Sequence, residues 1–264
     1  MTLSKQDLVD LHYAKCLLES PGLPAKLTNL IGVPLERGFA MLPARWSDTI
    51  GDVTARSLER ALKFAIGTLD ARPATVSNER LHKIAVAATG AGGGAFGLPA
   101  LALELPVSTT IMLRSIADVA RSEGENLRAP ETKVACVEVF ALGGRTEGDD
   151  ALDSAYFATR ATLARAVTEA ASHIAQRGMS SGSAPALVRL VSQVGSRFGV
   201  AVSEKAAAQA IPVLGAAGGA LVNTLFIDHF QGMARGHFIV RRLERAYDTE
   251  TIRREYTQLS TTGR

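Results

Sequence analysis

Apolar residues recur every three or four positions along most of the chain, which is the spacing of one face of an α-helix. The clearest case is residues 44–70, where Ile50, Val53, Leu58 and Leu62 fall on one face. The same pattern predicts helices over residues 131–144 and 151–178. Residues 186–209 predict two helical pieces, with Ser203 as the cap of the second. Because no set of strands emerges, we expect an all-α fold in a single multi-helix domain.

Two long apolar blocks depart from this amphipathic pattern. Residues 84–113 carry one charge, Glu104, and residues 206–227 carry none. Both blocks contain small residues spaced one helical turn apart, which lets helix backbones approach closely. These glycines are Gly90, Gly93, Gly94, Gly97, Gly215 and Gly219. We expect two Gly/Ala-rich apolar helical hairpins packed together, either as a soluble core or as elements that insert into a membrane.

Prolines and low apolar area argue against a stable transmembrane pass in either block. About 20 apolar residues are needed to span a bilayer, and both blocks reach that length. Pro99, Pro106 and Pro212 nevertheless interrupt them, and alanine and glycine add little apolar area. A phosphate-binding glycine loop is also disfavoured, because the GxGxxG spacing ending at Gly97 lacks a convincing preceding strand.

Composition narrows the classes of partner and the location. The 264 residues include 29 Lys and Arg against 26 Asp and Glu, a net charge of +3, and only 5% are aromatic. This mild basic character suits anionic surfaces, but no aromatic-studded basic strip indicates nucleic acid. Cys16 and Cys136 lie far apart, so a disulfide framework is not expected. The charged N-terminus lacks a signal-peptide core, and we expect a cytoplasmic location, peripheral at the inner face of the cell membrane.

Four ionisable residues near the apolar blocks are candidates for chemistry. Glu104 has no charged neighbour within nine positions, while Asp228 and His229 follow the second block and His237 lies on an inward apolar stripe. Glu104 is either satisfied by a backbone cap near Pro106 or a distant arginine, or it is a desolvated acid, base or metal ligand. The second alternative supports a hydrolase of lipid or peptide substrates that uses these four residues, with or without a divalent metal. It predicts that Glu104 and His229 approach each other.

A basic helix is expected over residues 232–250, close to the end of the chain. Its arginines would face anionic headgroups, each contributing about 1 kcal/mol near such a surface. The residues concerned include Arg235, Arg241 and Arg242. The plainer alternative is a solvated helix face, because acidic residues of the same region offset much of the charge.

Several segments together resemble one protein family. They are "ATGAGGGAFGLPAL", "TTIMLRSIADVA", "AIPVLGAAGGALVN" and "DHFQGMARGHFIVRRLERAY". In this order they are similar to the hallmark segments of EcsC family proteins, across roughly residues 45–250. The resemblance implies an intact domain over residues 45–260, preceded by an N-terminal helical extension over residues 1–44. It implies no catalytic residues.

The sequence thus favours one functional hypothesis over two others. The leading hypothesis is a cytoplasmic helical protein that associates with an anionic membrane surface or a membrane-protein partner, through the Gly-rich hairpins and the basic helix. The hydrolase is the alternative from another class. A scaffold that binds other proteins through its N-terminal helices is the third.

Overall fold

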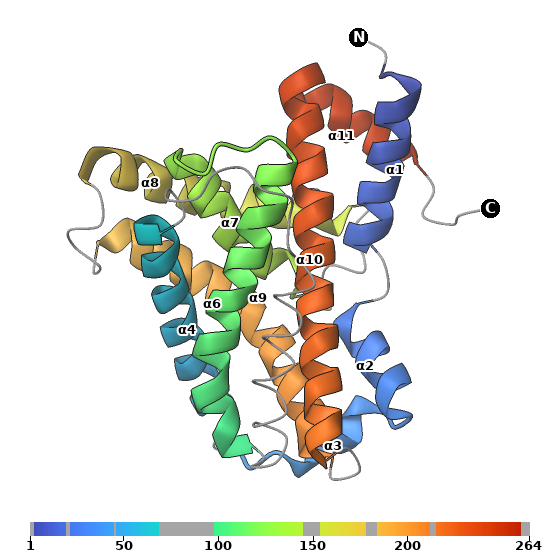
Figure 1. The fold of residues 1–264 in the computed structure, drawn as a ribbon, viewed down its shortest axis with the longest axis vertical. Helices are drawn as coiled ribbons and strands as arrows, with labels where there is room; N and C mark the ends of the chain where they lie inside the picture. The colour runs from blue at the N-terminus through green and yellow to red at the C-terminus, as the bar shows by residue number, and fades with distance from the viewer. Residues whose placement is uncertain are drawn as a thin grey trace.

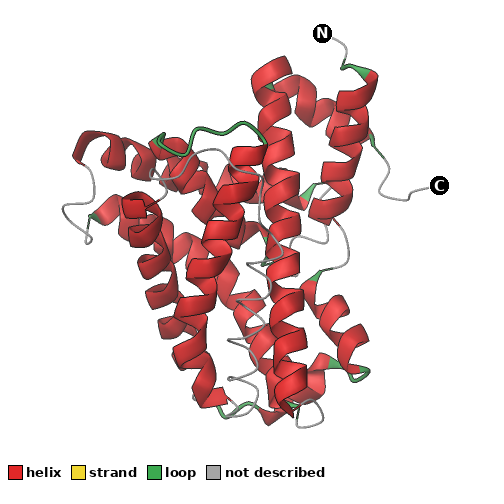
Figure 2. Ribbon diagram, viewed as in Figure 1, coloured by secondary structure: helices red, strands yellow, loops and turns green. Residues whose placement is uncertain are grey.

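The computed structural model describes residues 3–19, 22–44, 46–68, 98–144, 154–177, 184–211 and 215–259. Within these ranges every regular element is a helix (Figure 2). The all-α prediction is therefore confirmed. The helices are α1 (Lys5–Glu19), α2 (Leu23–Ile31), α3 (Leu35–Met41), α4 (Trp46–Thr68), α6 (Leu98–Ser122), α7 (Pro130–Leu142), α8 (Ala155–Arg177), α9 (Pro185–Ala210), α10 (Gly215–Tyr247) and α11 (Thr249–Gln258).

Helix α10 runs along the long axis of the molecule (Figure 1). Helices α1 and α6 pack along α10, and α4 packs against both α6 and α9. Helix α11 and α1 lie beside the C-terminal end of α10 (Figure 1). The arrangement leaves α4 and α6 as an outer pair on the side of the molecule away from α1.

Helix α7 forms the centre of the core. Every residue from Thr132 to Leu142 is buried, although the sequence showed only an ordinary short helix there. Phe140 of α7 meets Phe198 of α9 and Phe230 of α10, with ring centroids 4.8 and 5.4 Å apart. These tilted aromatic contacts join three helices that are far apart in sequence, and large buried rings contribute strongly to a core.

Helix boundaries differ from the sequence prediction in two places. Residues 186–209 belong to the single helix α9, and Ser203 lies inside it with its hydroxyl donating to the Gly199 carbonyl at 2.8 Å. Ser203 as a cap is therefore wrong, because a serine inside a helix can bond back to the preceding turn. The predicted basic helix is likewise the continuation of α10, which also includes the end of the second apolar block. The helix over residues 44–70 is confirmed as α4.

Pro106 lies inside α6 and does not end it. A proline has no N–H, so the carbonyl of residue 102, one turn earlier, cannot receive its usual helical hydrogen bond.

None of the described helices is long and apolar enough to cross a membrane.

Glycines do permit close helix packing, but at positions that the sequence did not single out. A Cβ on Gly236 of α10 would lie 3.0 Å from the Ala14 carbonyl oxygen of α1 and 2.6 Å from Leu18. A Cβ on Gly38 of α3 would overlap the backbone of Ala207 in α9. Of the predicted set, Gly90, Gly93, Gly94 and Gly97 lie outside the described residues, whereas Gly215 and Gly219 lie in the first turns of α10.

Candidate functional site

Glu104 is the centre of a buried ion pair. The Lys205 Nζ lies 2.8 and 3.0 Å from its two carboxylate oxygens, and the Asn223 side-chain amide donates to Oε1 at 2.9 Å. The Lys205 side chain is fully buried, and its ammonium lies 4.9 Å from the centre of the Phe226 ring. The isolated carboxylate of the sequence is thus satisfied by α9 and α10, through a lysine where a backbone cap or a distant arginine had been expected.

His229 and Asp228 point in different directions from neighbouring positions of α10. The buried His229 ring donates from Nε2 to the Gly143 carbonyl at 2.8 Å, at the end of α7. Asp228 is exposed, and its charge acts on Lys26 of α2, whose pKa is lowered by burial and partly restored by Asp228. The adjacent residues therefore serve separate helix contacts.

His237 belongs to a third, fully buried group between α8 and α10. Its Nδ1 lies 3.0 Å from the Tyr156 hydroxyl. That hydroxyl also accepts a hydrogen bond from the Arg160 guanidinium at 3.3 Å. Burial, together with the charges of Arg160 and Arg241, lowers the pKa of His237 well below its usual value. The histidine is consequently neutral at physiological pH.

The four candidate catalytic residues therefore lie in separate sets of contacts. Glu104 is bonded to Lys205, whereas His229 is bonded to the Gly143 carbonyl. Across the same described ranges, no group of three or more His, Cys, Asp or Glu side chains is placed to hold a metal ion.

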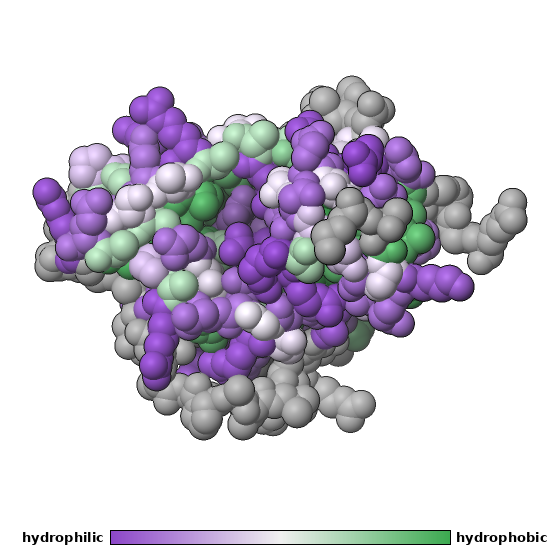
Figure 3. All heavy atoms as spheres, turned by 90° about the horizontal axis from the view of Figure 1, so that it is seen from above, coloured by the Kyte–Doolittle hydropathy of each residue, from purple (hydrophilic) through white to green (hydrophobic). Residues whose placement is uncertain are grey.

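The basic residues at the C-terminal end of α10 are matched by acidic partners. Arg241 donates to Glu125 at 2.9 Å. Arg242 contacts Asp10 of α1 at 2.6 Å and Glu123 at 3.3 Å. This end of the molecule is largely hydrophilic when seen from above (Figure 3). Its ion pairs compete with any external anion.

Arg235 is partly buried on the same helix. Burial raises the pKa of Glu123, and the charge of Arg235 opposes part of that rise. The arginines of α10 that the sequence predicts to face an anionic surface thus lie near Glu123 and Glu125, at the connection between α6 and α7.

Two further buried carboxylates were missed by the sequence reasoning. Burial raises the pKa of Glu138 to about 7, against the opposing effect of Arg160 and Arg241. Burial alone raises the pKa of Glu204, in α9, to about 7. The available signal at Glu138 was a charge between two valines in the apolar stretch of α7. A single charged residue in an apolar stretch does not say whether the helix is buried on all sides.

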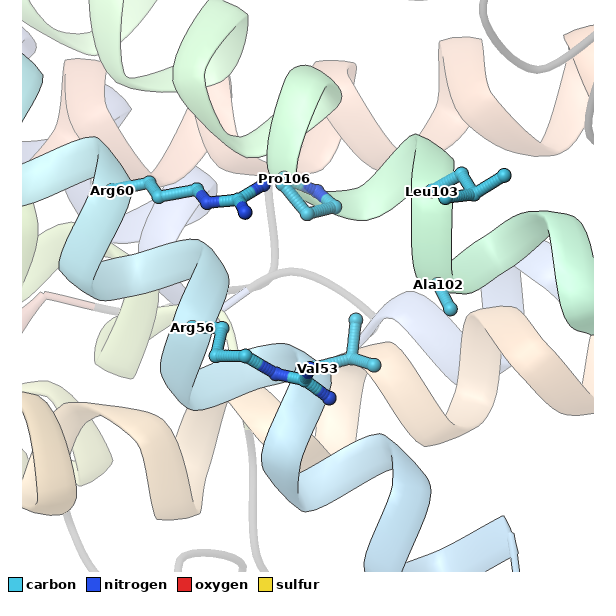
Figure 4. A pocket seen from close by; sticks show the side chains of 6 residues that line it. All are labelled: Val53, Arg56, Arg60, Ala102, Leu103 and Pro106. Carbon is cyan, nitrogen blue, oxygen red and sulfur yellow. The ribbon is translucent and has the colours of Figure 1, made fainter.

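A surface pocket of about 270 Å³ lies between α4 and α6. It is lined by Val53, Arg56, Arg60, Ala102, Leu103 and Pro106. Figure 4 shows the Arg60 side chain extending from α4 toward Pro106 of α6, with Arg56 one turn before it. Both arginines are exposed, and within the described residues neither lies within salt-bridge distance of a carboxylate.

The apolar rim of this pocket is unusually exposed. Leu103 is 80% exposed and Val107, one turn further along α6, is 49% exposed. Among the large apolar side chains that the structure describes, Leu103 is the most exposed, whereas burying such side chains usually stabilises the fold. The available sequence signal was the four-residue spacing of Arg56 and Arg60 beside Val53, but nothing in that spacing indicates that Leu103 lies beside these arginines.

The fold and this pocket define an all-helical protein with a basic, apolar-rimmed surface site. Comparison with known families identifies the family: the chain belongs to the EcsC protein family, whose model it matches over residues 15–243. The match includes α4, α6 and the pocket between them. Searches of curated proteins and of solved structures gave no match.

Proposed function

We propose that this EcsC-family protein binds the surface of anionic membranes as a peripheral protein, through the face formed by α4 and α6. One observation carries the proposal: two exposed arginines and an exposed leucine, Leu103, line the same pocket. Anionic headgroups attract the cations, while the apolar side chains enter the interfacial region. The arginines of α10 that the sequence favoured are less suitable, because carboxylates already bind them.

The expected binding is weak and reversible. Arg56, Arg60 and the exposed Lys63 each contribute about 1 kcal/mol near an anionic surface. Burying Leu103 adds about 2 kcal/mol. The exposed Asp52 and Glu59 on the same helix subtract part of this sum. A total of about 4 kcal/mol corresponds to a millimolar affinity, so the surface supports recruitment at high lipid density and not permanent anchoring.

Flotation with lipid vesicles tests the proposal directly. The full-length protein is mixed with vesicles of phosphatidylcholine alone, or with added phosphatidylglycerol, at low and high salt. We expect flotation only with anionic vesicles, and less of it at high salt, because salt screens exposed charges. A protein that fails to float with any vesicle contradicts the proposal and favours a protein partner.

A pair of matched variants locates the binding face. Leu103→Glu places a charge on the proposed face, and we expect it to weaken flotation at least tenfold. Val188→Glu introduces the same charge at a side chain of α9 that is 51% exposed and does not line the pocket. It should behave like the parent protein. Equal losses in both variants would show that net charge, and not the α4/α6 face, governs binding.

No observation on the described residues favours the hydrolase alternative. Its four residues are held in separate contacts, as set out above.

A further inference from the structure

Resting on the proposed function, we infer that the pocket between α4 and α6 binds one phospholipid molecule whose head group carries both a phosphate and free hydroxyl groups, as phosphatidylglycerol does. The arginines hold the phosphate, the Ala102 carbonyl accepts from a hydroxyl, and the apolar rim covers the start of the acyl chains. Three features of the pocket carry this inference, one for each part of the lipid.

The first feature is a pair of arginines with no acidic residue in the lining. Arg56 and Arg60 are one helical turn apart and both line the pocket. The Arg56 Nε donates to the Asp52 carbonyl at 3.1 Å, which orients the guanidinium and leaves its terminal N–H groups for a ligand. A phosphodiester offers two non-bridging oxygens that share one negative charge, and guanidinium groups bind phosphate oxygens through paired hydrogen bonds.

The second feature is the backbone acceptor that Pro106 creates. Because a proline lacks an N–H, the Ala102 carbonyl receives no hydrogen bond from residue 106. Ala102 and Pro106 both line the pocket on the α6 side (Figure 4), and we place this acceptor in the pocket wall. A backbone carbonyl that lacks its helical donor favours another donor. Among headgroup atoms, a hydroxyl supplies that donor, whereas a choline does not.

The third feature is the size and polarity of the space. A volume of about 270 Å³ equals that of roughly nine water molecules at ~30 Å³ each. A phosphoglycerol group, with about ten non-hydrogen atoms, suits such a space. The exposed Leu103 at the rim gives the first acyl carbons an apolar contact outside the pocket.

Titration calorimetry with short-chain lipids below their micelle concentration tests the inference without a membrane. Dihexanoylphosphatidylglycerol should bind the full-length protein with a stoichiometry of one. Dihexanoylphosphatidic acid, which lacks the glycerol hydroxyls, should bind at least threefold more weakly, and dihexanoylphosphatidylcholine should not bind. Glycerol 3-phosphate supplies the head group without chains and should bind at least tenfold more weakly. Equal affinity for glycerol 3-phosphate would overturn the lipid assignment in favour of a free phosphate ester.

Variants separate the three features. Arg56→Gln or Arg60→Gln should lower the affinity for the short-chain lipid at least tenfold. Arg37→Gln makes the same substitution at an exposed position of α3 outside the pocket lining, and it should leave this affinity unchanged. Pro106→Ala restores the helical hydrogen bond to Ala102 and should abolish the preference for phosphatidylglycerol over phosphatidic acid. Equal losses in the Arg56 and Arg37 variants, or an unchanged preference in the proline variant, would contradict the site.

The two proposals fail separately. Flotation with anionic vesicles, but no saturable binding of the short-chain lipid, would overturn the single-lipid site and leave the membrane proposal intact. Saturable binding without flotation would overturn the membrane proposal and show instead a site for a dispersed lipid. Binding in neither assay would overturn both.

Discussion

The buried ion pair between Glu104 and Lys205 supports a prediction that separates a structural from a chemical role. The Lys205 side chain has no area exposed to water. Its Nζ is paired with the Glu104 carboxylate at 2.8 Å. Glu104→Leu therefore leaves an ammonium buried without a counter-ion. Breaking a buried pair in this way costs about 3–5 kcal/mol, a large part of the 5–15 kcal/mol that stabilises a typical protein.

Replacing both partners should recover most of that loss. In Glu104→Leu/Lys205→Met no charge remains buried, and apolar replacement of a buried pair is often neutral or stabilising. The Asn223 amide loses its 2.9 Å contact with Glu104 in this variant, which costs up to about 2 kcal/mol. We therefore expect each single variant to lose about 3–5 kcal/mol, and the double variant to lose less than either.

Urea unfolding of the parent, the two single variants and the double variant measures this coupling. Midpoints at a constant slope report the change in stability. A loss below about 1 kcal/mol in Glu104→Leu, or single losses that simply add in the double variant, would refute the reasoning. Vesicle flotation of the double variant adds a functional readout. It should match the parent protein if Glu104 is structural, and a folded double variant without lipid binding would show that Glu104 does more.

Two further predictions concern the core. Because the pKa of Glu138 is raised to about 7 from 4.5, ionisation of this acid destabilises the fold as pH rises between these values, by up to about 3 kcal/mol at 1.36 kcal/mol per pH unit. Glu138→Gln should remove that dependence, so its urea midpoint relative to the parent should be higher at pH 8 than at pH 5; parallel profiles would contradict the shift. Gly236→Ala should lose about 1–3 kcal/mol, because its Cβ would meet Leu18 and the Ala14 carbonyl. The control, Gly51→Ala in open space on α4, should gain up to about 1 kcal/mol in the same thermal or urea measurement.

Local periodicity was sufficient to predict the helices, but not where they join. The amphipathic pattern of residues 44–70 matched α4, and the inward stripe correctly buried His237. The pattern wrongly predicted helix boundaries at Ser203 and at the start of the basic helix. At both places the helix continues through a residue of a type that often caps helices. Capping and continuation use the same serine hydroxyl, and packing against α4, α7 and α8 favours continuation in α9.

The candidate site was less predictable than the fold. Glu104 stood out because it was the only charge in its block, yet its partner Lys205 lies 101 positions away. The arginines of α10 were conspicuous in the sequence, but Glu125 and Asp10 come from elements that only the fold brings to that end. Arg56 and Arg60 drew no attention, because nothing in their local pattern shows that α6 leaves an exposed Leu103 beside them.

The sequence by itself therefore determined the helical class, the EcsC resemblance and the apolar faces, since these depend on residue types at short spacing. Tertiary structure alone decided which charges are neutralised and which stay available. Ion pairing and burial depend on which helices become neighbours, and the helical pattern of one segment carries no record of the segment that packs against it. For this reason the basic surface assigned to α10 in the sequence is now proposed on α4, where arginines remain exposed beside an apolar rim.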